Sequence, residues 1–282
     1  MPAVSVVVPY RNGAQFIPGL VWMLQRQSFT NWCCFLVDDQ STDDGPLIAV
    51  QSVDGDDRFR LLSFSGSKAF PGPAAVRNFA LAHVTTCLVA FCDVDDLWHP
   101  LKLERQLAFH SSHELDLSVT GYWRFRDASN FPVVTNRCPP EALSYRKLFG
   151  GNPIPMLSVI VRSDFLKDGM PEIRHEDFAL WLDMFRNNPG LRYGCLPEGL
   201  AFYRLHSGSI TSHRWKMPCW ALAVFRRQGL SPLALFQAML LWSFSQLRQL
   251  VLSFQVFRDS SQMSLSVLLE RPPVRLRQGG WF

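Results

Sequence analysis

Residues 87–98 have the sequence CLVAFCDVDDLW, an apolar run followed at once by Asp93, Asp95 and Asp96. A short apolar run bounded by polar turn residues is typical of a strand that is buried on both faces of a parallel sheet. Ligands of such sheets bind outside the carboxyl ends of the strands, which is where these carboxylates fall. The stretch therefore predicts an α/β fold and the edge of the sheet at which a site should lie.

The residues around this stretch repeat the pattern of strand and helix. Further apolar or β-branched runs predict strands over 4–8, 32–37 and 59–64. Apolar residues at helical spacing predict helices over 16–27, 47–53, 74–85 and 101–110. This alternation indicates a doubly wound, mostly parallel sheet flanked by helices. Two more polar clusters follow strands, and we expect them at the same edge: Pro9-Tyr10-Arg11-Asn12 and Asp38-Asp39.

The second half of the chain has a more mixed pattern. It predicts strands over 117–125, 156–161 and 193–203, and helices over 145–149 and 176–186. Residues 220–257 are expected to be helical with a break near Gly229 and Pro232. Residues 258–282 contain paired prolines and two adjacent glycines, and are expected to form a loose tail. A helical C-terminal appendage should therefore follow the sheet.

Composition narrows the class of protein. The chain has 282 residues, of which 48% are hydrophobic, 18% charged and 13% aromatic, and this excludes disordered, collagen-like and coiled-coil proteins. The net charge of +4 is uneven, because residues 204–282 contain ten basic and two acidic residues, which leaves 18 and 22 for the remainder. A basic end on an acidic body indicates an anionic partner, first of all an anionic membrane surface. Nucleic acid is not expected, because base-stacking motifs are missing.

The seven cysteines follow no disulfide or metal-ligand spacing, so we expect buried free thiols in a reducing cytosol. His110 and His113 have helical spacing but no nearby Cys or His partner, so zinc is not expected. The N-terminal apolar stretch is short and lacks a basic flank and a small-residue cleavage site, which favours a strand over a signal peptide. Walker, dinucleotide-binding, zinc-protease and serine-hydrolase motifs are absent from the sequence.

Carboxylates just past two strands are the first candidate ligands. Asp93, Asp95 and Asp96 have the spacing to hold Mg²⁺ or Mn²⁺ with open positions for a diphosphate, and the alternative is a solvated turn. Asp38 or Asp39 can accept a hydrogen bond from a nucleobase or a ribose, and the alternative is capping of the following segment.

Other charged residues have a functional and a structural interpretation. Arg77, and Arg11 beside the first strand, can clamp a diphosphate or lie on the surface. Glu176-Asp177 opens a helix, where acids are favoured by the helix dipole alone, but either can also act as a general base. Arg204 and His206 can contact phosphate or acceptor, and the alternative is an ordinary loop.

Taken together, these stretches resemble the family 2 glycosyltransferases, which have a GT-A fold. The resemblance spans about residues 2–212, with Gln40 where a small residue is usual and Val76 before the arginine. The motifs that carry it, in the family's order and spacing, are Val4-Ser-Val-Val-Val-Pro-Tyr-Arg-Asn12, Leu36-Val-Asp-Asp-Gln-Ser-Thr-Asp43, Pro73-Ala-Ala-Val-Arg-Asn78, Phe91-Cys-Asp-Val-Asp-Asp-Leu-Trp98, His175-Glu-Asp-Phe-Ala-Leu-Trp-Leu182 and Tyr203-Arg-Leu-His-Ser-Gly-Ser-Ile210.

The resemblance implies an inverting transferase that uses a nucleotide-diphosphate sugar, with a catalytic domain over 1–212 and a helical region over 213–282. It implies that Asp177 is the general base and that Glu176 supports the acceptor site. It implies Mg²⁺ or Mn²⁺ held by Asp95 with Asp93 or Asp96. It further implies that the donor is bound by Pro9, Tyr10, Arg11, Asp38, Asp39, Arg77, Asp93 and Asp95. A UDP-linked donor is favoured, and the expected acceptor is a glycan or lipid-linked hydroxyl in surface polysaccharide biosynthesis.

Residues 230–256 are rich in Leu, Phe and Trp but are interrupted by Gln237, Gln246, Arg248 and Gln249. Three interpretations stay open for them: docking on a membrane surface, packing on the catalytic domain or in a homodimer, and a spanning helix. The first predicts a cytoplasmic protein at the inner face of the membrane. Two other functions also stay open, a catalytically silent nucleotide-sugar-binding subunit and a polyprenyl-phosphate sugar transferase.

Overall fold

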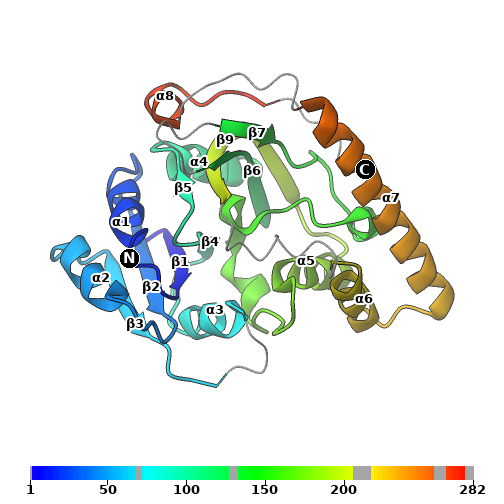
Figure 1. Ribbon diagram of the computed structural model, residues 1–282, viewed down its shortest axis with the longest axis horizontal. Helices are drawn as coiled ribbons and strands as arrows, with labels where there is room; N and C mark the ends of the chain where they lie inside the picture. The colour runs from blue at the N-terminus through cyan, green and yellow to red at the C-terminus, as the bar shows by residue number, and fades with distance from the viewer. Residues whose placement is uncertain (1, 68–71, 127–132, 206–216, 257–264, 277–282) are drawn as a thin grey trace.

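The computed structural model describes residues 2–67, 72–126, 133–205, 217–256 and 265–276 (Figure 1). Its centre is a nine-stranded sheet with the order β3-β2-β1-β4-β8-β6-β9-β5, and β7 pairs with β6 beside this path. The strands are β1 (Val4–Tyr10), β2 (Trp32–Asp38), β3 (Phe59–Ser63), β4 (Leu88–Phe91), β5 (Leu97–Trp98), β6 (Leu117–Arg126), β7 (Val133–Arg137), β8 (Ile160–Arg162) and β9 (Tyr193–Leu205). The α-helices are α1 (Ile17–Gln25), α2 (Gly45–Val53), α3 (Ala74–Leu81), α4 (Lys102–Ser112), α5 (Glu176–Asn187), α6 (Met217–Arg227), α7 (Pro232–Val256) and α8 (Leu265–Glu270).

The first half of the sheet is parallel, as the alternating pattern predicts. β1 pairs with β2 and β4, β2 pairs with β3, and α1, α2 and α3 connect these strands along the chain. All seven residues of β1 are buried. Alternate residues of β1 enter two cores: Val6 packs in a core with α1, α2 and α4, and Val7 in one with α3 and α5. Because helices cover both faces, these strands are continuously apolar.

The second half of the sheet is mixed. β8 lies antiparallel between β4 and β6, and β9 runs parallel to β6 with two register shifts. Since β8 reverses direction between them, β6 and β9 point the same way as β1 to β4. Their carboxyl ends therefore reach the same edge of the sheet, which confirms the predicted mixed, mostly parallel α/β architecture.

The structure corrects several predicted elements. Residues 156–161 do not form one strand, because Met156–Ser158 is a 3₁₀ turn that closes with the Ser158 N–H and hydroxyl on the Pro155 carbonyl. β5 and β7 were not predicted. The short helix predicted over 145–149 is a 3₁₀ turn, η1 (Lys147–Gly150), and α3 ends four residues before the predicted 85.

The predicted break in the C-terminal helical region is confirmed, because α6 ends at Arg227, Gly229 has a φ of +64°, and α7 begins at Pro232. Both helices pack on the sheet's larger core through buried residues such as Phe225, Ala238 and Trp242. Figure 1 shows α6 and α7 on the side of the molecule opposite α1 and α2.

The loose tail predicted from residue 258 onward is wrong for residues 265–276. These residues form α8 and then a segment that pairs with β9, where the Gly199 N–H donates to Val274 and the Leu276 N–H donates to Pro197. The imidazole Nε2 of His99 also lies 2.9 Å from the Arg271 carbonyl oxygen. Leu265, Leu268 and Leu276 are buried, so apolar side chains fix the segment to the sheet.

Four cysteines are buried free thiols as expected, but Cys87 and Cys219 are exposed, so the expectation is wrong for these two. Cys87 lies just outside β4, which begins at Leu88. Buried His110 contacts the Ser118 hydroxyl, and exposed His113 contacts the Phe109 carbonyl. Within the described ranges, every helix is too short or too polar to cross a membrane.

Candidate active site

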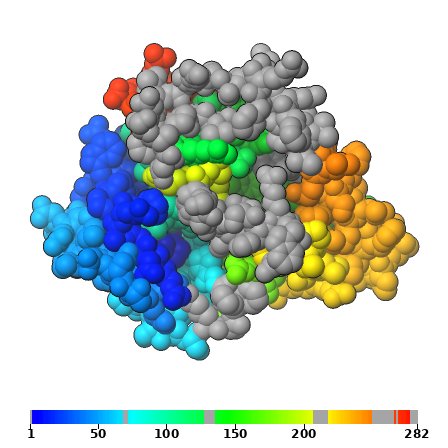
Figure 2. Space-filling model, viewed as in Figure 1, coloured from blue at the N-terminus to red at the C-terminus, as the bar shows by residue number. Residues whose placement is uncertain are grey.

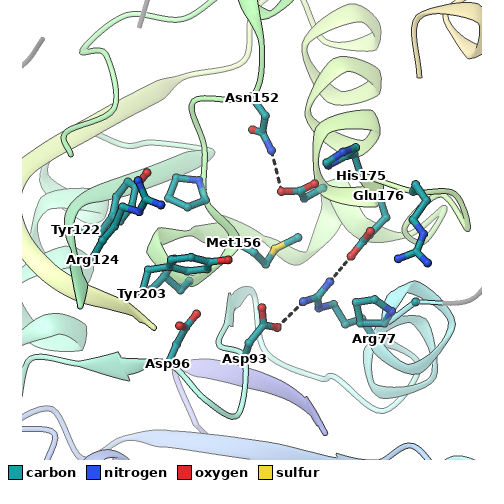
Figure 3. Close-up of a pocket in the computed structure, with 16 residues that line it drawn as sticks. Arg77, Asp93, Asp96, Tyr122, Arg124, Asn152, Met156, His175, Glu176 and Tyr203 are labelled. Atoms are coloured by element: carbon teal, nitrogen blue, oxygen red, sulfur yellow. Dashed lines mark hydrogen bonds and ion pairs between the residues drawn. The ribbon is translucent and has the colours of Figure 1, made fainter. Parts of the chain in front are cut away.

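A cavity of about 350 Å³ opens at the carboxyl edge of the sheet (Figure 3). Its walls come from the loop after β4, the start of α3, the strands β6 and β9, the loop after η1 and the start of α5. The polar and aromatic side chains that line it are Arg77, Asp93, Asp96, Tyr122, Arg124, Asn152, Arg174, His175, Glu176, Asp177 and Tyr203. Segments far apart in the sequence thus meet at the edge where the sequence predicts a site.

Arg77 lies between two carboxylates. Its guanidinium donates to Asp93 at 2.6 Å and to Glu176 at 2.8 Å, as the dashed lines in Figure 3 show, and it is only 3% exposed. Burial opposes its charge, but Asp93 and Glu176 outweigh burial and hold the pKa of Arg77 above its ordinary value. The buried guanidinium therefore ties the loop after β4 to the start of α5, and the alternative that Arg77 lies on the surface is wrong.

The acids after β4 form a tight turn in which the Asp96 N–H donates to the Asp93 carbonyl. Residues three apart in such a turn come to the same side, and Asp93 and Asp96 both line the cavity, whereas Asp95 is not among its lining residues. Asp96 accepts the Arg204 N–H at 2.9 Å, and the Arg204 guanidinium donates to the Asp95 carbonyl. Burial, then repulsion by the two neighbouring acids, raises the pKa of Asp96 well above its usual range.

Glu176 and Asp177 lie in the first turn of α5, after His175 in the left-handed conformation with a φ of 57°. Asp177 accepts a hydrogen bond of 2.7 Å from the Asn152 amide and one of 2.7 Å from its neighbour's backbone N–H. Burial raises the pKa of both carboxyls, and Arg77 opposes this rise in each. A buried carboxylate with a raised pKa is a stronger base than one in water.

The residues at the ends of β1 and β2 form a second polar group, and its predicted donor residues are not among those that line the cavity. Tyr10 pairs with Asp38 in the sheet register, and the Asp39 N–H donates to the Tyr10 carbonyl. Asp38 accepts the Ser41 N–H at 3.1 Å within the turn after β2, and it does not cap α2, which begins only at Gly45. A Cβ added to Gly13 would lie 3.2 Å from Val94, so this group abuts the acidic turn.

The other predicted residues of this group differ in exposure. Pro9 is buried within β1, and Arg11 is exposed just beyond its end. His206 lies outside the described residues.

No group of three or more His, Cys, Asp or Glu side chains with metal-binding geometry occurs within the ranges that the structure describes. Asp93 and Asp96 nevertheless fit a Mg²⁺ or Mn²⁺ ion that takes its other ligands from water and a diphosphate, which is how Mg²⁺ is usually bound at phosphate sites.

Sequence patterns did not single out Asn152, Tyr122 or Arg124, although all three line the cavity. Tyr122 and Arg124 face one way from β6, and the alternation of a strand could have suggested them once the sheet order was known. Asn152 lies in an irregular loop after two glycines, where no periodicity exists to signal its place.

Comparisons with known proteins show the family and the fold of the chain. The family described as "Glycosyl transferase family 2" matches residues 5–166. TuaG of Bacillus subtilis, a glycosyltransferase named for teichuronic acid biosynthesis, is 34% identical over 217 residues, which are 76% of this chain and 84% of TuaG. The UDP-Glc:alpha-D-GlcNAc-diphosphoundecaprenol beta-1,3-glucosyltransferase WfgD of Escherichia coli is 28% identical over 216 residues, which are 76% of this chain and 81% of WfgD.

Two solved structures share the fold. TarS 1–349 of S. aureus in complex with UDP-GlcNAc has a TM-score of 0.63 and 21% identity, over 86% of this chain and 71% of TarS 1–349. The mannosyltransferase PcManGT of Pyrobaculum calidifontis in complex with GDP-Man and Mn²⁺ has a TM-score of 0.63 and 15% identity, over 97% and 76% of the two chains. These structures place the chain in the GT-A fold.

Proposed function

Because this chain belongs to glycosyl transferase family 2 and is a glycosyltransferase, we propose that it transfers a sugar from a UDP-sugar to a hydroxyl of a lipid-linked glycan, with inversion. The observation that carries the proposal is the pair of Asp93 and Asp177 in one cavity, one at the end of β4 and the other at the start of α5. A donor bound at the first and an acceptor at the second would meet within the cavity.

In the proposed reaction Asp177 takes the proton from the acceptor hydroxyl. The oxygen of that hydroxyl attacks the anomeric carbon as the bond from this carbon to the nucleoside diphosphate breaks, so that one displacement inverts the configuration. Glu176 contacts the acceptor side. The group of Pro9, Tyr10, Arg11, Asp38 and Asp39 holds the nucleoside, and Arg77 keeps Asp93 and Glu176 in place through its two ion pairs.

We propose that Asp93 and Asp96, with Asp95 as the further candidate, hold Mg²⁺ or Mn²⁺ beside the donor diphosphate. Such an ion supplies positive charge for the departing diphosphate. The two carboxylates in the cavity support this proposal, as does the Mn²⁺ in the structure of PcManGT. Arg204 donates to the same turn through its backbone and its guanidinium, and Arg204 and His206 remain the candidate contacts to phosphate or acceptor.

The lipid-linked acceptor is supported by the relative WfgD, whose name gives a diphosphoundecaprenol acceptor, and a role in surface polysaccharide biosynthesis by the name of TuaG. A lipid-linked acceptor requires the enzyme to reach a membrane, and α7 offers a surface for this. Its outer face exposes Leu233, Phe236, Leu240, Leu241, Phe244 and Leu247. Figure 2 shows α6 and α7, in yellow and orange, protruding from one side of the molecule. We propose peripheral attachment there, at the cytoplasmic face of an anionic membrane.

Calorimetry with a panel of nucleotide sugars, in Mn²⁺ and in EDTA, tests the donor and metal together. UDP-glucose is the first donor because WfgD uses it by name. We expect metal-dependent binding of one UDP-sugar and its loss in Asp93→Ala and Asp96→Ala, and Asp95→Ala tests whether the third acid takes part. Transfer of the bound sugar to an α-GlcNAc-diphosphate lipid should then be abolished by Asp177→Asn while donor binding persists.

Other outcomes would contradict the proposal. Metal-independent binding would reject the ion, and a folded protein that binds no nucleotide sugar and no nucleoside diphosphate would favour a silent partner subunit. An active Asp177→Asn variant would reject Asp177 as the base.

A further inference from the structure

Asn152 lies in the loop between η1 and the 3₁₀ turn at Met156–Ser158, where the backbone turns sharply. Gly151 has a φ of +129°, a conformation that side-chain-bearing residues rarely adopt. A Cβ added to Gly151 would lie 3.4 Å from Gln246 and 4.0 Å from Trp242, both on α7. The glycine thus lets the loop turn against α7 and carry the next side chain toward α5.

Both ends of the Asn152 amide are occupied. Its nitrogen donates to the Asp177 carboxylate at 2.7 Å, and its oxygen accepts the Ile154 N–H at 3.1 Å (Figure 3 shows the amide pointing at this carboxylate). The Ile154 N–H can only donate, so it requires the amide oxygen on its own side. The orientation of the amide is therefore fixed, and its NH₂ group must face Asp177.

A second contact clamps the same loop to the same helix. The indole N–H of Trp181 donates to the Ile154 carbonyl at 3.2 Å, and Trp181 is fully buried one turn along α5 from Asp177. The loop is therefore joined to α5 at two points, and the Asn152 amide has little freedom to move away from the carboxylate.

We infer that Asn152 is a positioning residue that holds the Asp177 carboxylate in one orientation, with a lone pair left to accept the acceptor's proton. This inference rests on the proposed role of Asp177 as general base. Each carboxylate oxygen has room for a second hydrogen bond beyond those from Asn152 and the Phe178 N–H, so the base stays available while its rotation is restricted.

The charges around Asp177 predict how the pH dependence of activity should change when Asn152 is replaced. Burial raises the pKa of Asp177, and the Phe178 N–H, the Arg77 guanidinium and the Asn152 amide each lower it, while Asp93 raises it. Glu176 is the neighbouring acid on α5, where burial raises its pKa and the charge of Asp177 raises it further. Loss of the Asn152 donor should therefore raise the pKa of Asp177 further, and activity at low pH should fall.

The test compares Asn152→Asp and Asn152→Ala with wild type, by kcat and KM against pH, with the UDP-sugar that the calorimetric panel identifies and an α-GlcNAc-diphosphate lipid. Asn152→Asp keeps an oxygen for the Ile154 N–H but replaces the donor with a like charge. We expect its kcat to fall about tenfold or more near neutral pH, to recover as the pH rises, and to leave the donor KM unchanged. Asn188→Asp is the matched control, because its amide donates to the Met184 carbonyl at the far end of α5 from Asp177.

The outcomes separate the inference from the proposed function. If Asp177→Asn is inactive and both Asn152 variants keep the wild-type pH profile, the positioning role is wrong and the proposed function stands. If Asn152→Ala loses activity at every pH and Asn152→Asp does not, the residue supports the loop alone, which also rejects the inference. An active Asp177→Asn variant, or a wild type that transfers no sugar from the panel, rejects the proposed function and this inference with it.

Discussion

At the scale of single residues, Arg77 joins two parts of the cavity wall through its ion pairs with Asp93 and Glu176. Arg77→Met should leave Asp93 and Glu176 facing each other without a cation and destabilise the protein by about 3–5 kcal/mol at neutral pH. Glu176 already has a raised pKa, which should rise further, so the folded variant binds its proton more strongly than the unfolded chain. The difference in free energy of unfolding between wild type and Arg77→Met should therefore become smaller as the pH falls.

Urea unfolding of wild type and Arg77→Met at pH 7 and pH 5 measures this effect, with Arg105→Met as the control for an exposed ion pair, to Glu198. An equal deficit at both pH values would show that the loss comes from packing rather than from the two carboxylates left without their cation.

Lys102 gives a second effect of pH. Its ammonium is fully buried, lies 3.9 Å from the ring centroid of Trp98 and donates to Gln106, and burial lowers its pKa to about 7. Between that value and the ordinary lysine pKa, the unfolded chain binds one more proton than the folded one, so the free energy of unfolding should rise with pH. Urea unfolding between pH 6 and 9 should show this rise in wild type and lose it in Lys102→Met. Parallel curves for the two proteins would contradict the prediction.

The sequence predicts which residues gather at the sheet edge better than what each one contacts. Asp93, Asp96, Glu176 and Asp177 are found in one cavity because strand ends and helix starts are local patterns. The placement of Arg77 between acids that lie 16 and 99 positions away depends on how the strands are ordered, which no local pattern contains.

At the scale of elements, α7 has an inner face that packs on the protein and an outer face that does not. Ala238, Trp242 and Ser245 are buried, whereas Phe236 and Phe244 are 61% and 68% exposed. The double variant Phe236→Glu/Phe244→Glu should lose most of its sedimentation with phosphatidylglycerol vesicles at low salt, because it sets two charges against an anionic apolar surface.

The matched control is Leu47→Glu/Val50→Glu on α2, which adds the same charges at apolar positions that are 57% and 60% exposed. Equal losses of sedimentation in both variants would show that the added negative charge, and not the loss of the apolar face of α7, weakens binding to the vesicles. A wild type that stays in the supernatant and is dimeric by light scattering would instead assign the outer face to a second copy of the chain.

The elements that the sequence does not predict are short strands that depend on pairing with another strand. β5 has only two residues, and it is a strand because Leu97 and Trp98 pair with Phe202 and Ala201 of β9. β7 exists by its pairing with β6. In contrast, β1 and α5 carry enough apolar residues at regular spacing to be recognised alone.

At the scale of the whole molecule, the segment after α8 completes the sheet. Leu276 is buried against β6, where a Cβ on Gly121 would lie 2.7 Å from its side chain. Leu276→Ala should therefore lower the free energy of unfolding by about 2–3 kcal/mol in urea denaturation. Val274→Ala is the control, because that side chain is 40% exposed in the same segment. An equal loss in the control would mean that the burial of the Leu276 side chain has no special part in holding the segment.

This pairing also affects how the chain is built and handled. The Gly199 N–H and the Pro197 carbonyl pair with Val274 and Leu276, which the ribosome adds long after β9 itself. Until then, that part of the sheet has unsatisfied hydrogen-bonding groups, and a nascent chain that pauses earlier presents them to chaperones or to other chains. A truncated protein that ends after α7 would lack the residues that pair with Pro197 and Gly199. An affinity tag should therefore be added after the C-terminus and should not replace residues 265–276.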